Sequence, residues 1–298
     1  MEPSSVPRFD TWLLGRAQDG GVPHLGCDLA CCAEARAEGR VEYPCSLGVR
    51  DLLTGSLALI DATPAVESQI AMLHQRTNTP PRGRRPVDAV LLTHAHIGHY
   101  AGLLQFGKEV GAIDATPVYC TPRMARFVRS NAPWSALHSD RHIELAEIPL
   151  APDGRGTFEP LPGLSVEAIV VPHRDEYSDT VAFRLSGPSQ TVLWAPDVDQ
   201  WGKHAGLAER LVDGVDIAYV DGTFYDEDEL GGRDLDTIPH PVMRETMSVL
   251  GSAVKARPGR VRFIHFNHTN PVLHGAAARA QVESLGFGVA SVGESFGL

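Results

Sequence analysis

A short apolar strand that leads directly into a histidine cluster is the feature that most constrains this chain. The β-branched and leucine-rich run Val90–Leu92 predicts a buried strand that ends at Thr93. His94 and His96 lie two residues apart on extended backbone, so their rings project to the same side and can bind one ion. His99 follows where the chain turns toward a helix, so its ring could face the same pocket. Because neutral imidazole suits zinc, manganese and iron, the segment predicts a metal site; three chance surface histidines, held as helix-terminal caps, are the alternative.

Short apolar runs alternate with segments of helical periodicity along the whole chain, which is typical of an α/β fold. The predicted strands are Thr11–Leu14, Leu57–Ile60, Ala89–Leu92, Pro117–Tyr119, Val166–Val171, Thr180–Phe183, Thr191–Trp194, Val215–Val220 and Val261–Phe266. The predicted helices are Pro64–His74, Pro122–Ser130, Ala205–Val212, Pro241–Lys255 and Ala276–Leu285. The linkers Thr77–Pro86 and Ala151–Pro162 are expected to be surface loops, and residues 1–298 are expected to form a single domain.

Composition and charge exclude several classes of protein. The chain has 298 residues, is 43% hydrophobic and carries a net charge of −11, so it can bury a large core but lacks a nucleic-acid binder's excess of Lys and Arg. Its apolar runs are far shorter than the ~20 residues of a membrane span. The N-terminal residues 1–7 include an acidic residue and two prolines and lack the basic and apolar regions of a signal peptide. We therefore expect a cytoplasmic protein with no nucleic-acid partner and no membrane partner.

The histidine segment resembles the signature of the metallo-β-lactamase superfamily, His-x-His-x-Asp-His after a strand. The resemblance continues in the expected order through Leu59–Ala62, Val171–His173, Trp194–Asp197 and Phe263–His268. It implies a four-layer αββα metallo-β-lactamase-like sandwich. Gly20–Cys27 and Pro44–Ser46 resemble the branch that contains the cyclic-phosphate phosphodiesterase of phosphonate breakdown. Asp61–Pro64, Asp221–Phe224 and His268–Pro271 resemble the pyrroloquinoline quinone biosynthesis protein B family.

Carried over to this sequence, the resemblance implies two adjacent metal sites. The first holds His94, His96 and His173, with Asp197 bridging to a second that keeps His99 and His265. Gly98 stands where the superfamily signature has aspartate, which removes one negative charge and one oxygen ligand. The affinity for a second ion should fall, unless Asp175, Glu176 or Asp199 reaches in. The expected cofactor is Zn²⁺, as one or two ions, with Mn²⁺ or Fe²⁺ as alternatives.

Each downstream ligand also has a plainer interpretation. His173 fits a buried, hydrogen-bonded histidine, and Asp197 fits a cap of the following turn. His265 lies in the alternating run Val261–Phe266 and fits a satisfied core residue.

A group of cysteines near the N-terminus suggests a further metal site. Five cysteines, an odd number, indicate thiols or metal ligands before disulfides in a chain without an export signal. The phosphodiesterase branch has a Cys-x-Cys-x-x-Cys knot that binds a structural zinc with a late histidine. Cys27, Cys32 and His268 match this pattern, Leu29 replaces the middle cysteine, and Cys31 is the candidate fourth ligand. Reduced cysteines packed as small hydrophobic residues are the alternative.

These residues predict a metal-dependent hydrolase that uses metal-bound hydroxide. The expected substrate is a small anionic molecule, a phosphodiester such as a cyclic phosphate or a related ester, and a homodimer is allowed. Asp197 would orient the hydroxide. The resemblance to the phosphodiesterase branch implies that His240 donates to the leaving oxygen, and a plain helix-start residue is the alternative. Substrate choice is expected to depend on the loops Thr77–Pro86, Asn131–Arg141 and Tyr225–Ile238. The alternatives are an oxygen-using redox enzyme with an iron centre, in quinone-cofactor or natural-product biosynthesis, and a non-catalytic metal-binding homologue.

Overall fold

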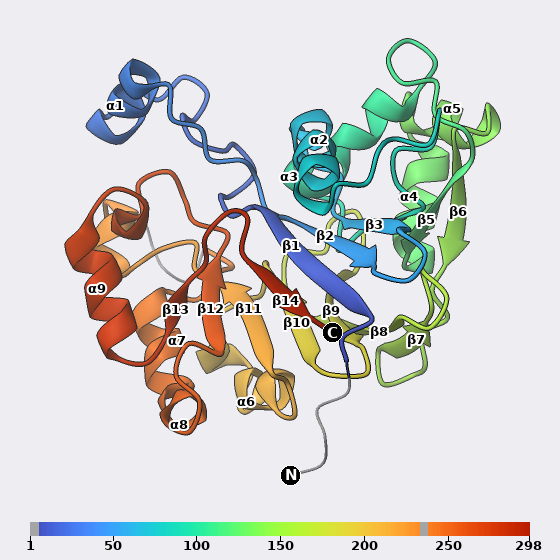
Figure 1. Ribbon diagram of the computed structural model, residues 1–298. Helices are drawn as coiled ribbons and strands as arrows, with labels where there is room; N and C mark the ends of the chain where they lie inside the picture. The colour runs from blue at the N-terminus through green and yellow to red at the C-terminus, as the bar shows by residue number, and fades with distance from the viewer. Residues whose placement is uncertain (1–5, 233–237) are drawn as a thin grey trace.

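The computed structural model describes residues 6–232 and 238–298. Residues 1–5, part of the N-terminal segment that favours a cytoplasmic protein, and residues 233–237 of the loop Tyr225–Ile238 lie outside this description. Within the described residues, two seven-stranded sheets face each other, and helices cover the outer face of each sheet (Figure 1). This arrangement confirms the predicted four-layer αββα sandwich.

The first sheet has the strand order β14-β1-β2-β3-β4-β5-β6. Its strands are β1 (Phe9–Gly15), β2 (Ser46–Asp51), β3 (Leu57–Ile60), β4 (Ala89–Leu91), β5 (Thr116–Cys120), β6 (Ile143–Glu147) and β14 (Ser295–Gly297). Neighbours are antiparallel from β14 to β3 and parallel from β3 to β6. Every residue of β3 and β4 is buried, as expected for parallel strands that are covered on both faces.

The second sheet repeats this plan, with the order β13-β12-β11-β10-β9-β8-β7. Its strands are β7 (Arg155–Phe158), β8 (Ser165–Val171), β9 (Thr180–Ser186), β10 (Thr191–Ala195), β11 (Ile217–Asp221), β12 (Val261–Ile264) and β13 (Gly288–Val289). Neighbours are antiparallel from β7 to β10 and parallel from β10 to β13. Each sheet therefore has a parallel half, in which the C-terminal ends of neighbouring strands lie at one edge.

Helices form the two outer layers, and one helix stands apart. Those that belong with the first sheet are α2 (Val66–Thr77), α3 (Ile97–Tyr100), α4 (Pro122–Ser130), α5 (Trp134–Ser139) and the 3₁₀ helix η1 (Ala101–Phe106). Those that belong with the second sheet are α6 (Leu207–Val212), α7 (Met243–Val249), α8 (Gly251–Lys255), α9 (Ala276–Ser284) and the 3₁₀ helices η2 (Trp201–Lys203), η3 (Glu227–Leu230) and η5 (Pro271–Leu273). Helix α1 (Ala30–Glu38) projects from the sandwich on the segment between β1 and β2 (Figure 1).

Three apolar layers hold the four structural layers together. The central layer lies between the sheets and includes Phe9, Leu47, Phe183 and Trp194. A second layer packs the first sheet against α2 and α4, and a third packs the second sheet against α6 to α9. The two rigid sheets therefore hold the loops at their strand ends in fixed relative positions.

Segments that the sequence predicts as loops contain regular structure, among them Tyr225–Ile238 with the 3₁₀ helix η3. Ala151–Pro162 includes the edge strand β7, whose Gly156 lies directly against the backbone oxygen of Pro149. This strand shows no apolar alternation, so its pattern does not distinguish it from a loop. Asn131–Arg141 includes the short helix α5.

The predicted helix Pro241–Lys255 is also wrong in part. It begins at Met243 and is interrupted at Leu250, between α7 and α8. Gly251 follows the break and is a weak helix former, which is consistent with an interruption there.

No helix among the described residues is both long enough and apolar enough to cross a membrane.

Candidate metal centre

Six predicted ligands meet where the C-terminal ends of strands from both sheets come together. His94 follows β4, His173 follows β8, Asp197 follows β10, and His265 follows β12. The side chains brought together are His94, His96, His99, His173, Asp197 and His265, each within 4.8 Å of other candidate ligands. Parallel strands end at the same edge of a sheet, so the fold itself produces this convergence.

The first ligand set consists of His94, His96, His173 and Asp197, whose ligand atoms all lie within 4.8 Å of one another. His94 Nε2 is 2.8 Å from His96 Nδ1, and His173 Nε2 is 3.5 Å from Asp197 Oδ1. The backbone N–H of Ala95 donates to Ser178 Oγ at 2.8 Å and so fixes the loop between the first two histidines. Three imidazoles and one carboxylate form a ligand set that suits zinc, which can bind a water in addition when its coordination expands to five.

A second ligand set shares Asp197 with the first. Asp197 Oδ2 lies 3.0 Å from His99 Nε2 and 3.2 Å from His265 Nε2. A further carboxylate approaches the same two rings, since Asp19 Oδ1 lies 3.4 Å from His99 Nε2 and 3.7 Å from His265 Nε2. Asp19 comes from the segment after β1. The sequence analysis did not identify it as a site residue.

Contacts behind the ligands turn their Nε2 atoms inward. His99 Nδ1 lies 2.8 Å from Asp61 Oδ2, and His173 Nδ1 lies 3.1 Å from the Pro239 carbonyl oxygen. His265 Nδ1 lies 2.9 Å from Thr223 Oγ1. Metal-binding histidines commonly use their second nitrogen in this way, because the contact fixes the orientation and tautomer of the ring.

Both Asp61 and His265 have positive φ angles, 64° and 61°. This left-handed conformation is uncommon for residues other than glycine, and such strain often occurs at functional sites. It is consistent with a strand-end geometry that is maintained to place these two side chains.

The His240 ring lies next to two rings of the centre, at centroid distances of 5.1 Å from His173 and 5.6 Å from His265. Its Nδ1 is 2.7 Å from Asp221 Oδ2, and Asp221 Oδ1 accepts a hydrogen bond from Thr223 Oγ1 at 2.7 Å. The sequence predicts His240 itself but no role for Asp221 or Thr223, which were recognised only as part of a motif.

Burial and neighbouring charges divide the histidines into two groups. Burial lowers the pKa of His173 to about 4 and lowers the pKa of His94 and His96 below the usual value. Burial has the same tendency at His99 and His240, but Asp61 and Asp197 raise the pKa of His99 and Asp221 raises that of His240. The three histidines of the first ligand set therefore favour the neutral form that binds a cation.

Two carboxylates of the centre, Asp197 and Asp19, have a lowered pKa. Burial would raise the pKa of Asp197, but His265 and His99 lower it well below its usual range. Burial would also raise the pKa of Asp19, but the same two rings lower it. Asp197 is only 3% exposed, and buried negative charge requires compensation.

Unsatisfied atoms at the centre fit a bound cation. The Nε2 atoms of His173 and His265 and the Oδ2 atom of Asp197 are buried and form no hydrogen bond with any described residue. All three point into the space that the two ligand sets enclose. Nitrogen and carboxylate donors left open in this way suit zinc and other first-row divalent ions.

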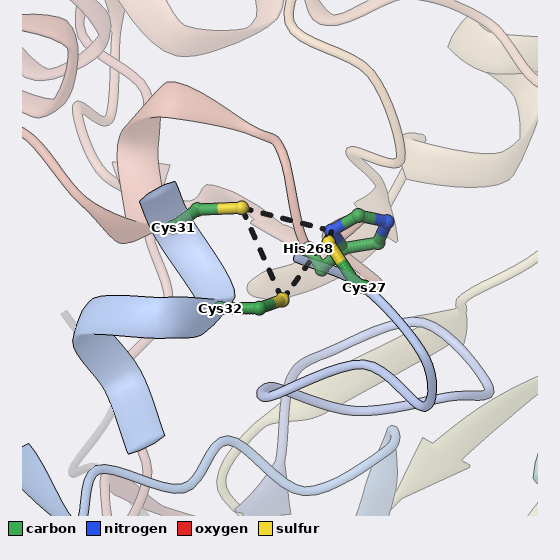
Figure 2. A group of neighbouring side chains, drawn as sticks. All are labelled: Cys27, Cys31, Cys32 and His268. Atoms are coloured by element: carbon green, nitrogen blue, oxygen red, sulfur yellow. Dashed lines mark hydrogen bonds between the residues drawn. The ribbon is translucent and has the colours of Figure 1, made fainter. Parts of the chain in front are cut away.

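The cysteine group also converges. Figure 2 shows Cys31 and Cys32 on α1 with Cys27 from the preceding loop, their sulfur atoms directed toward the His268 ring. His268 Nδ1 is 3.7 Å from the sulfurs of Cys27 and Cys31 and 3.6 Å from that of Cys32, and the two sulfurs on α1 are 3.9 Å apart. A tetrahedral zinc would hold such atoms roughly 3.5 to 3.8 Å apart. Leu29, at the position of the missing cysteine, is 53% exposed.

The acidic residues that the sequence offered as replacements for the missing aspartate lie elsewhere. Asp175 is exposed and pairs with Arg123 at 3.2 Å. Glu176 is 3.6 Å from His96 Nε2, at the outer side of the first ligand set. Asp199 lies 3.7 Å from both Lys203 and His204. The expectation that one of them completes the second ligand set is wrong.

A four-layer sandwich with a histidine and aspartate centre at its strand ends defines a protein of the metallo-β-lactamase fold. Residues 58–266 match the profile of a family described as a beta-lactamase superfamily domain. The chain belongs to this superfamily.

Similar proteins confirm the branch that the sequence motifs indicated. Coenzyme PQQ synthesis protein B of Methylorubrum extorquens is 28% identical over 304 residues, covering 94% of this chain and 97% of that protein. Its counterpart in Methylobacterium radiotolerans is 29% identical over 310 residues, covering 96% and 99%.

Two solved structures extend the comparison. The structure of Zn²⁺-bound PqqB from Methylobacterium extorquens matches with a TM-score of 0.80 and 28% sequence identity. The match covers 97% of this chain and 100% of that chain. A diphosphatase of the PhnP family has a TM-score of 0.65 and 20% identity, covering 97% of each chain, which is a likeness of fold alone.

Proposed function

We propose that this chain is a metal-dependent hydrolase that cleaves a small anionic phosphodiester, such as a cyclic phosphate, or a related ester, with zinc as its cation. The observation that carries the proposal is the first ligand set, in which the ligand atoms of three histidines and Asp197 converge within 4.8 Å. Membership of the beta-lactamase superfamily and the zinc in a similar protein support it.

A divalent cation at this centre lowers the pKa of a bound water and withdraws charge from the substrate. Side chains of the protein would position the reacting water and the substrate. Asp197 presents one carboxylate oxygen to His173 and the other to His99 and His265, so it can orient a water molecule between the two ligand sets.

His240 fits the role of the general acid. Its Nδ1 is held by Asp221, which leaves Nε2 as the atom that can donate to a leaving oxygen. Burial opposes a charged ring, but Asp221 raises the pKa of His240 above its usual value, so the ring carries the proton that an acid needs.

The surroundings of the centre favour a small anion. His94, His99 and Asp197 are nearly inaccessible, and solvent reaches the ligands at His96 and Asp19. Arg174 is half exposed and adjacent to the ligand His173, and its charge adds to the effect of burial in lowering the pKa of His96. Positive charge beside the exposed ligand would attract a phosphate ester.

Elemental analysis of the purified protein, combined with a panel of phosphodiesters, esters and lactones, tests the proposal. We expect zinc or manganese in the protein and turnover of a diester that does not require oxygen. His94→Ala should abolish this turnover, because it removes one ligand of the first set. Turnover that persists unchanged in His94→Ala would refute the assignment.

A redox function in quinone-cofactor or natural-product biosynthesis is the second candidate. It is favoured by the 28 to 29% identity to coenzyme PQQ synthesis protein B over nearly the whole chain. The same histidines would then hold iron. Iron in the purified protein and loss of activity without oxygen would support this function, whereas oxygen-independent turnover with zinc would exclude it. Bound metal without turnover in either assay would indicate a non-catalytic homologue.

A further inference from the structure

The segment that carries Asp19 is fixed against the strand end that carries His265. The backbone N–H of Phe266 donates to the Arg16 carbonyl at 2.9 Å, and the N–H of Gln18 donates to the Phe266 carbonyl at 2.8 Å. A turn closed by the N–H of Gly21 on the Gln18 carbonyl, also at 2.8 Å, contains Asp19. Backbone hydrogen bonds therefore hold the segment that carries this carboxylate in place.

Asp19 and Asp197 approach the same pair of nitrogens. The four distances from Asp19 Oδ1 and Asp197 Oδ2 to the Nε2 atoms of His99 and His265 range from 3.0 to 3.7 Å. A cation with bonds of about 2.0 to 2.2 Å separates tetrahedral ligand atoms by roughly 3.3 to 3.6 Å. Asp19, His99 and His265 therefore form one candidate ligand group, with ligand atoms within 4.8 Å of one another, and Asp197 brings a second carboxylate to the same two imidazoles.

Asp19 also fills the space that a side chain at position 98 would need. A Cβ atom built on Gly98 would lie 2.6 Å from Asp19 Cγ and 2.7 Å from its Cα, and closer still to Oδ1. Gly98 does not have a left-handed φ, but the Cα of residue 19 stays in place whatever side chain that residue carries, so a side chain at position 98 also requires the backbone at residue 19 to shift. Position 98 is where the superfamily signature has its aspartate, and the carboxylate of Asp19 reaches the same place from another part of the chain.

We propose that Asp19 is the carboxylate ligand of a second cation, bound with His99, His265 and Asp197, and that it replaces the aspartate missing at position 98. The carboxylate at position 19 then requires a glycine at position 98, because residues 19 and 98 cannot both carry a carboxylate side chain in this space. This inference rests on the proposed function only in that the centre is taken to bind metal.

Exchange of the two positions tests the inference directly. Asp19→Gly should weaken binding of the second ion by at least about tenfold and leave the first ion in place. Gly98→Asp alone should crowd Asp19 and should not strengthen the second site. The double variant Asp19→Gly/Gly98→Asp moves the carboxylate back to position 98. It should restore the second ion through a small shift of the residue 19 backbone, whose Cα would otherwise lie 2.7 Å from the new Cβ. Glu176→Gln is the control, since it removes an acidic group that lies beside His96 and outside the second set.

Metal binding is the readout. Equilibrium dialysis against Mn²⁺ with elemental analysis gives the number of ions, and the electron paramagnetic resonance signal of a coupled Mn²⁺ pair identifies the two-ion state. Two ions in the unmodified chain, one in Asp19→Gly and two in the double variant would support the inference. A single ion in the unmodified chain, or second-ion affinity unchanged in Asp19→Gly, would overturn it.

Ester turnover is scored separately, so the two proposals can fail independently. Loss of the second ion in Asp19→Gly without ester turnover in any variant would leave this inference standing and refute the hydrolase. Ester turnover together with an Asp19→Gly variant that keeps both ions would do the reverse.

Discussion

Asp61 Oδ2 lies 2.8 Å from Nδ1 of His99, and both side chains are almost completely buried. Asp61 also accepts hydrogen bonds from the backbone N–H and the hydroxyl of Thr93, both at 2.9 Å through Oδ1. The aspartate thus joins the end of β3 to the loop after β4 and directs His99 Nε2 toward Asp197. It is a positioning residue of the second ligand set.

Asp61→Asn should weaken binding of the second ion by about 10- to 100-fold. If the amide oxygen keeps the Thr93 hydrogen bonds, the amide nitrogen would donate to His99 Nδ1 and place the ring proton on Nε2, where it blocks the metal. Asparagine tolerates the φ of 64° at this position better than alanine does. Competition with a chromophoric chelator measures the affinity. The control is Asp51→Asn at a buried aspartate that pairs with Arg8, and equal losses in both variants would contradict the prediction.

The two-ion state should be lost before the one-ion state as the pH falls from about 8 to 6. The pKa of His173 is about 4 and that of His94 is well below its usual value, so these two imidazoles of the first set stay neutral over this range. The pKa of His99 is raised by Asp61 and Asp197 against the effect of burial, so its ring must lose a proton before it binds metal. Calorimetric titration in two buffers with different heats of ionisation counts the protons released. Two binding steps with the same pH dependence would show that His99 does not control the second.

The sequence was sufficient for much of the candidate site because its signals are local. His94, His173, Asp197 and His265 each follow an apolar strand within a few residues, and strands that end at one edge bring such residues together. Asp19 had no such signal. Its place in the centre depends on hydrogen bonds between its segment and Phe266, which no pattern within the segment reveals.

Strands that are buried on both faces of a sheet could be predicted from the sequence. Strands at the sheet edges were harder to predict. The buried strands β3 and β4 have continuous apolar sequences, whereas the edge strand β7 has the sequence Arg-Gly-Thr-Phe and depends on pairing with β8 for its conformation. Helix α1 was missed for a similar reason, since only Cys32 and Ala35 of its residues are buried. Segments of this kind owe their structure to tertiary contacts rather than to a periodic pattern.

The cysteine group should hold one zinc that is independent of the histidine and aspartate centre. Burial, together with the neighbouring Cys32, raises the pKa of the Cys31 thiol to about 11, and a cation would reverse this shift because the thiolate is the ligand. Cys31→Ser should therefore lower the zinc content by about one ion per chain and expose α1 to protease. Cys120→Ala is the control, because Cys120 is buried in β5 away from the group. Unchanged zinc content in Cys31→Ser would leave these cysteines as packing residues.

His240→Asn should lower kcat for a phosphodiester with a poor leaving group by about 10² to 10⁴, without changing the metal content. Asparagine can keep the hydrogen bond to Asp221 that Nδ1 makes at 2.7 Å, and it lacks the Nε2 atom that would donate the proton. A nitrophenolate leaving group needs little protonation, so with such a diester the loss should be much smaller. His204→Gln, at a partly exposed histidine beside Asp199, is the matched control. Equal losses for the two leaving groups would show that His240 only supports the structure of the centre.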